Sequence, residues 1–126
     1  MISFLNLEEI IHINDMVVKI SGGSVGVRDK NLLESAVNNP KSLYFYNNAD
    51  LYKIAAAYAF SIIKNHPFLD GNKRTGFACM RIFLSTNGLR LDFKQQETED
   101  MMVNIANNKV GFLSVENWLR GLEEVG

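Results

Sequence analysis

Nine consecutive residues, His66 to Arg74, combine the side chains that phosphate chemistry needs. The run contains one imidazole, one carboxylate, one glycine, one amide and two cations. An imidazole titrates near neutral pH and can accept the proton of an attacking hydroxyl. A lone carboxylate beside a phosphate suits Mg²⁺, which completes its shell with phosphate oxygens and water. The run therefore predicts a site that binds nucleotide phosphates.

The backbone around these side chains favours the same interpretation. Pro67 disfavours the α conformation at His66, so a preceding helix should end there. Gly71 permits a sharp turn, and the helix that follows begins with free N–H groups, which bind anions. Lys73 and Arg74 fall in the first turn of that helix, where its dipole disfavours positive charge. A bound phosphate would compensate both cations, and arginine can hold it with two hydrogen bonds.

Each member of the run also has an ordinary structural interpretation. Asp70 or Asn72 could be the N-cap of the following helix, and Phe68 is expected to point inward and anchor the loop. The combination within nine residues is what favours a phosphate site. The Walker pattern of phosphate-binding loops does not occur.

Helical spacing and capping signals predict an all-α, compact bundle of about six helices that position this run. Two of them, from Asp50 to Lys64 and from Asn72 to Asn87, are apolar nearly all round and are expected to form a buried central pair. The other four are expected at residues 6–22, 29–39, 96–107 and 114–123, the last capped by its serine. Four large residues between Pro40 and Asn47 predict one short strand or hairpin: Leu43, Tyr44, Phe45 and Tyr46.

Composition sets the remaining limits. The 126 residues suggest a single domain, 1–126, and a net charge of −1 argues against direct nucleic-acid binding. The single cysteine, Cys79, is expected to be a small core residue, and no apolar run is long enough to span a membrane. A cytoplasmic protein is the natural expectation.

The nine-residue run resembles the signature of the Fic/Doc family, His-x-Phe-x-Asp/Glu-Gly-Asn-Gly-Arg-x-x-Arg. Further resemblance lies in the stretches Gly22–Asp29, Leu32–Ala36 and Phe83–Gly88, so that it covers most of the chain from about Phe4 to Leu91. It is closest to the death-on-curing (Doc) toxin branch. The implied fold is a helical bundle with a short β-hairpin flap.

The resemblance also implies a role for each residue. His66 would be the general base, and Asp70 would bind Mg²⁺. The phosphates of ATP would be held by Gly71, Asn72, Lys73 and Arg74. The residues Leu43 to Tyr46 match the family's flap in position, so they would either pair with an extended segment of the target or simply cover the edge of the core.

Two departures from the signature bear on the reaction. Lys73 replaces the second glycine, and Phe77 replaces the final arginine, which would lie on the same helical face as Arg74. Members of the Doc branch carry this change and are thought to transfer the γ-phosphoryl group instead of the nucleotidyl group. Gly71 points the other way, because the toxin that names the branch has alanine there. Adenylylation therefore remains the alternative reaction.

By resemblance, the protein is a kinase-type toxin of a toxin–antitoxin pair. It would use Mg-ATP to phosphorylate a protein hydroxyl, on elongation factor Tu in this family, and so block translation. The family's inhibitory motif, Ser/Thr-x-x-x-Glu-Gly/Asn, does not occur in the chain. A separate, Phd-like antitoxin is therefore the expected partner. A toxin-like binding module without catalysis is the other alternative.

Overall fold

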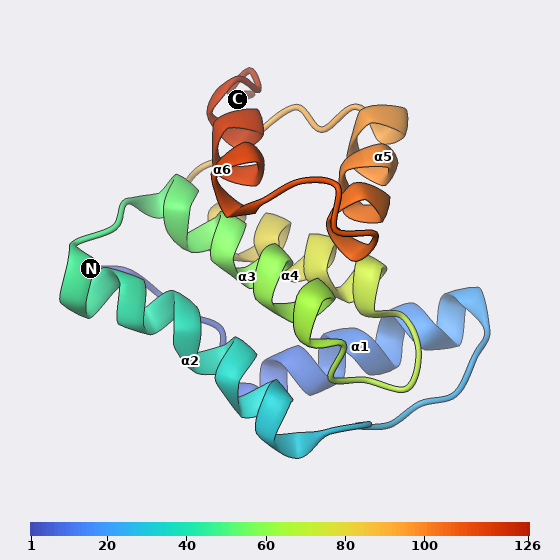
Figure 1. Cartoon of the computed structure of the whole chain (residues 1–126). Coiled ribbons are helices and arrows are strands. Elements are labelled where there is room, and N and C mark those ends of the chain that lie inside the picture. Colours follow the sequence, from blue (N-terminus) through green and yellow to red (C-terminus); the bar gives the residue numbers. More distant parts are fainter.

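The structure, a computed structural model, describes residues 1–126 and contains six α-helices (Figure 1). The helices are α1 (Leu7–Ser21), α2 (Lys30–Asn47), α3 (Leu51–Asn65), α4 (Asn72–Thr86), α5 (Gln95–Ala106) and α6 (Phe112–Arg120). Extended pairing is limited to two isolated bridges, Val27 with Phe68 and Leu91 with Glu124. The prediction of an all-α bundle is confirmed.

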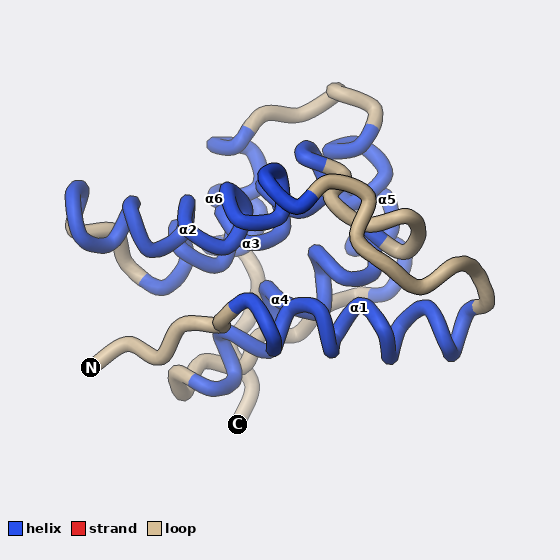
Figure 2. The backbone as a smooth tube through the Cα atoms, turned by 90° about the horizontal axis from the view of Figure 1, so that it is seen from below, coloured by secondary structure: helices blue, strands red, loops and turns tan.

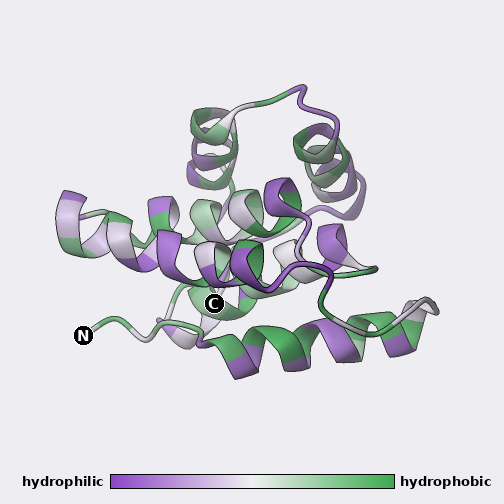
Figure 3. Cartoon of the chain, turned by 60° about the horizontal axis from the view of Figure 1, so that its bottom comes forward, coloured by the Kyte–Doolittle hydropathy of each residue, from purple (hydrophilic) through white to green (hydrophobic).

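The helices lie in three tiers (Figure 1). α3 and α4 form the middle tier, with α5 and α6 on one side and α1 and α2 on the other. The view from below shows α1 lying beside α4 (Figure 2). Hydrophobic and hydrophilic residues alternate along the outer helices (Figure 3), as expected of helices with only one face on the core. No helix combines the length and apolarity that crossing a membrane requires.

Three of the predicted helix starts are confirmed by their capping contacts. Asn6 and Glu9 form a reciprocal capping box on α1, with distances of 2.8 and 3.0 Å. The carboxylates of Asp29 and Asp50 accept N–H groups in the first turns of α2 and α3. The predicted cap at Ser114 is wrong, because α6 begins earlier, after Gly111, without a side-chain cap.

The second helix differs from the prediction. α2 continues through Pro40 to Asn47, so the expected hairpin at Leu43, Tyr44, Phe45 and Tyr46 is helical. Tertiary packing explains why: the Pro40 ring is buried, and the rings of Tyr44 and Phe45 pack on Phe4 with centroids 5.7 and 6.1 Å away. Asn48, with φ 51°, then ends the helix in the left-handed conformation. The pair Asn47 and Asn48 therefore ends α2 and is not a hairpin turn.

The central pair is confirmed. α3 has nine buried residues, and it packs on α4 so closely that a Cβ on Gly76 would lie 2.8 Å from Ile63 Cγ1 and 3.2 Å from the carbonyl oxygen of Ala59. Cys79 is fully buried in this core, as predicted, and burial raises the pKa of its thiol. The two helices therefore form a rigid support for the loop between them.

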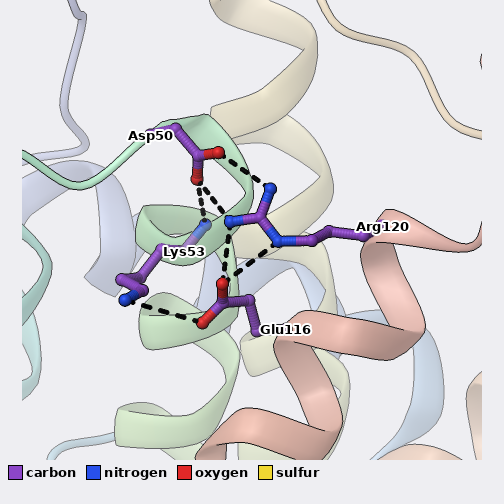
Figure 4. Close-up of polar contacts among 4 residues, drawn as sticks. All are labelled: Asp50, Lys53, Glu116 and Arg120. Carbon is purple, nitrogen blue, oxygen red and sulfur yellow. Dashed lines mark hydrogen bonds and ion pairs between the residues drawn. The ribbon is translucent and has the colours of Figure 1, made fainter.

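A charged cluster ties α6 to the start of α3 (Figure 4). The Arg120 guanidinium donates to both carboxylate oxygens of Asp50, at 2.8 and 3.0 Å, and to Glu116 at 2.7 Å. Lys53 lies 3.9 Å from the second oxygen of Glu116. The hydrogen bonds from Arg120 hold the pKa of Asp50 below its ordinary value of 3.8.

Candidate active site

The predicted phosphate run forms the loop between α3 and α4. α3 ends at Asn65, and His66 follows in the left-handed conformation with φ 50° and ψ 53°. Gly71, with φ 77°, is the N-cap of α4. Both predicted boundaries are confirmed, and the loop His66–Gly71 is called the motif loop below.

The start of α4 leaves hydrogen-bond donors free. The N–H groups of Asn72, Lys73 and Arg74 have no backbone acceptor, and no side chain caps the helix. The side chains of Lys73 and Arg74 are exposed, and neither belongs to any of the four ion pairs of the chain. Two uncompensated cations and a helix N-terminus therefore share one small region, which is suited to an anion.

A hollow of about 250 Å³ opens at this place and is called the motif hollow. The residues that line it are Ile63, His66, Leu69, Asp70, Gly71, Asn72, Lys73, Arg74 and Ala106. The structure thus brings together every residue predicted to bind phosphate or metal, with the predicted base at the same hollow. His66 is exposed and lies within reach of a molecule that enters it.

Asn72 is the member of the run whose side chain is already engaged. Its Oδ1 accepts the N–H of Phe68 and its Nδ2 donates to the carbonyl of Phe68, both at 3.0 Å. Asn72 is only 5% exposed, and Phe68 is 1% exposed. The side chain of Asn72 therefore braces the motif loop, and its backbone N–H is the group available to a ligand. Phe68 points inward, as expected, and its role as an anchor of the loop stays a prediction.

An extended segment from α1 to α2, Gly22–Asp29, lies along the motif loop. The Arg28 N–H donates to the carbonyl of Pro67 at 2.7 Å, and the Leu69 N–H donates to the carbonyl of Gly26 at 3.0 Å. This pairing is the bridge between Val27 and Phe68. The extended element beside the site is thus Gly22–Asp29 and not the residues predicted as the flap.

Arg28 is a site residue that the sequence analysis did not single out. Its Nε donates to the carbonyl of His66 at 2.6 Å, and its Nη2 donates to the carbonyl of Asn65 at 3.0 Å. These are carbonyls at the end of α3, where a cation also complements the helix dipole. Arg28 therefore joins the extended segment to the backbone that carries His66. The available signal was an arginine in a glycine-rich segment that already matched the family.

Asp70 fits a cation that takes few ligands from the protein. Its Oδ2 accepts the N–H of Ser24 at 2.7 Å, and the exposed carboxylate lines the motif hollow. No three His, Cys, Asp or Glu side chains of the chain come together as a metal cluster. A single carboxylate is compatible with Mg²⁺, whose remaining ligands are commonly phosphate oxygens and water.

A second hollow, of about 580 Å³, adjoins the first between α4 and α5. It is lined by Lys73, Arg74, Phe77, Phe93, Gln95, Thr98, Glu99, Met102 and Val103. The ring of Phe77 packs edge-on against Phe93 with centroids 5.1 Å apart. Position 77, where the family signature has an arginine, therefore presents an aromatic ring to this hollow.

Comparison with known proteins agrees with the geometry. Residues 4–84 match the model of the Fic/DOC family. The chain is 34% identical to "Toxin Doc" of Mycolicibacterium smegmatis over 125 residues, which cover 96% of this chain and 94% of the relative. It is 30% identical to "Protein kinase doc" of Escherichia phage P1 over 116 residues, which cover 91% of each. The chain belongs to the Fic/DOC family, in its Doc toxin branch.

Proposed function

We propose that this protein is a toxin that transfers the γ-phosphoryl group of Mg-ATP to a hydroxyl of a protein target. The observation that carries the proposal is the start of α4, where three free N–H groups and two unpaired cations adjoin one hollow. Such a site favours a group with several negative charges, and a triphosphate is the common metabolite of that kind. The relative named as a protein kinase supports phosphoryl transfer over other uses of the site.

The residues of the motif hollow have distinct roles in this reaction. His66 accepts the proton of the attacking hydroxyl as the oxygen–phosphorus bond forms. The bond between the γ-phosphorus and the β–γ bridging oxygen breaks, and ADP leaves with that oxygen. Lys73, Arg74 and the free N–H groups neutralise charge on the phosphates and fix their position. Catalysis of this type depends mainly on positioning, which the rigid pair α3 and α4 provides.

Asp70 is the residue that would hold Mg²⁺. When bound, the ion supplies charge neutralisation on the phosphate oxygens. The contact of Asp70 with Ser24 leaves one carboxylate oxygen without a protein hydrogen bond, which suits an ion with a single protein ligand.

Phe77 favours phosphoryl transfer over adenylylation. The side chain adds no positive charge to the adjoining hollow, and its ring is held by Phe93. The positive charge that would bind the phosphates lies instead at Lys73 and Arg74, at the start of α4. This arrangement supports binding in which the terminal phosphate is the group placed at the base.

Isotope transfer tests the reaction. Purified protein is incubated with Mg²⁺, a bacterial lysate and ATP labelled at either the γ- or the α-phosphate. Label on a protein from the γ position alone is expected, and it should be lost in His66→Ala and Arg74→Ala. Lys64→Ala is the matched control, because Lys64 is an exposed cation at the end of α3 that does not line the hollow. Transfer from the α position alone would refute the kinase and establish adenylylation.

The biological role is tested in growing cells. One relative is named as a toxin and one as a protein kinase. From the resemblance to the Doc branch, we infer that a small antitoxin, similar to Phd, restrains this toxin, and that elongation factor Tu is a candidate target. Expression of the chain alone should stop growth and translation, and His66→Ala should relieve the arrest. An arrest that persists unchanged in His66→Ala would instead favour a binding module without catalysis. Identification of the labelled protein by mass spectrometry tests the target.

A further inference from the structure

Asn14 connects α1 to the loop at the start of α4. The side chain is fully buried, and its Nδ2 donates to the carbonyl of Asp70 at 2.9 Å and to Thr75 Oγ1 at 3.1 Å. A Cβ on Gly71 would lie 3.4 Å from Nδ2 and 3.0 Å from Val18 Cγ2. α1 is therefore the floor on which the Asp70–Gly71 turn lies, and Asn14 is the polar contact of this floor with the turn.

The hydrogen bond from Asn14 to the carbonyl of Asp70 fixes the direction of the Gly71 N–H. A trans peptide is planar, so the carbonyl of Asp70 and the N–H of Gly71 point in opposite directions. Because Asn14 holds the carbonyl toward α1, the Gly71 N–H points away from α1. No residue of α1 lines the motif hollow, whereas Gly71 does, and the N–H of Gly71 has no acceptor within the protein.

The hydrogen bonding of Asn14 is incomplete, and this lowers the stability of the fold. Its Oδ1 is buried and has no hydrogen-bond partner. The amide cannot be reversed to satisfy it, since an oxygen would then face the carbonyl oxygen of Asp70. A buried acceptor without a partner destabilises a protein, and an apolar side chain of similar size carries no such cost.

We propose that Asn14 is a positioning residue of the phosphate site: by holding the carbonyl of Asp70, it presents the N–H of Gly71 to the bound phosphate. The inference rests on the proposed function, because it needs an anion in the motif hollow. It predicts that loss of the amide weakens ATP binding far more than it weakens the fold.

The test compares Asn14→Leu with wild type in calorimetric titrations with Mg-ATP and in thermal unfolding. Affinity is expected to fall about tenfold or more, the loss typical of a hydrogen bond to a charged group. The unfolding midpoint should stay within about 5 °C of wild type, because the unpartnered acceptor is also removed. Asn39→Leu is the matched control: it also removes an amide contact between helices, to Ser61 Oγ at 2.9 Å, but away from the motif hollow. It should leave affinity unchanged.

A second measurement uses the wild-type chain, so the proposal can be tested even if the variant does not fold. On addition of Mg-ATP, the amide proton resonance of Gly71 should move downfield. Unchanged affinity in Asn14→Leu, a loss of affinity accompanied by a larger fall in midpoint, or an unmoved Gly71 resonance would each overturn the inference while leaving the proposed function in place. A folded wild-type chain that binds no Mg-ATP would overturn both.

Discussion

Replacing Asn72 with alanine is expected to destabilise the protein as well as inactivate it, because its side chain braces the motif loop. The substitution removes two hydrogen bonds of 3.0 Å and leaves the N–H and the carbonyl of Phe68 without partners. Phe68 is 1% exposed, so water cannot readily replace them. Two such groups cost about 2–4 kcal/mol together, and the better helix propensity of alanine returns about 0.5 kcal/mol. The expected net loss is therefore about 1.5–3.5 kcal/mol.

Urea unfolding followed by circular dichroism measures this loss directly. For a domain of this size, it corresponds to a fall in melting temperature of about 6–13 °C. Asn72→Asp keeps an acceptor for the Phe68 N–H, but its second carboxylate oxygen would face the carbonyl oxygen of Phe68 in a buried place, so it should be at least as destabilising as alanine at neutral pH. Asn31→Ala is the matched control, since Asn31 is an exposed asparagine in the first turn of α2. If Asn72→Ala unfolds like wild type but no longer binds ATP, the amide acts on the ligand and the bracing argument is refuted.

Three further perturbations test other contacts. Gly71→Ala should lower the free energy of unfolding by about 1–3 kcal/mol, measured in urea, because φ is 77° and the new Cβ would lie 3.0 Å from Val18 Cγ2. Adding Val18→Ala should recover only the part of this loss that comes from the steric contact. Full recovery would exclude backbone strain. Arg28→Met should slow label transfer several-fold with little change in ATP affinity, because it removes the hydrogen bonds that hold the backbone of His66. An unchanged rate would show that Arg28 does not position His66. Arg120→Met should cost about 2 kcal/mol at pH 7, a modest value because this arginine and Asp50 are largely exposed. The pKa of Asp50 is lowered in the folded state, so its share of stability is present above pH 3.8 and is lost as the pH falls through the folded-state pKa. The gap between wild type and Arg120→Met should therefore narrow in acid, and a gap that widens would contradict the assignment.

Local signals predicted most of the helices correctly. The capping box of Asn6 and Glu9 and the N-caps Asp29 and Asp50 act within one helical turn, so the local sequence contains all of the interacting groups. The same holds for the break between α3 and α4, where Pro67 and Gly71 restrict the backbone directly. These elements could be located without knowledge of the fold.

The largest failure, at Leu43 to Tyr46, occurred where distant contacts outweighed local preference. Pro40 usually ends a helix, and the aromatic run after it has strand propensity. In the structure, Phe4 offers this run an aromatic partner about forty residues away in the sequence, and α2 continues to Asn47. No local pattern contains that partner.

The same division applies to the phosphate run His66–Arg74. The sequence by itself determined which groups are present and that a helix begins beneath them, because side-chain chemistry and backbone preference are local properties. Only the tertiary structure decided how these groups are held. Asn14 from α1 and Arg28 from the extended segment reach the motif loop from more than 35 residues away, and they are recognised as site residues only by their hydrogen bonds. Hydrogen bonds between distant segments depend on how the helices pack, and this packing is what fixes the orientation of the loop.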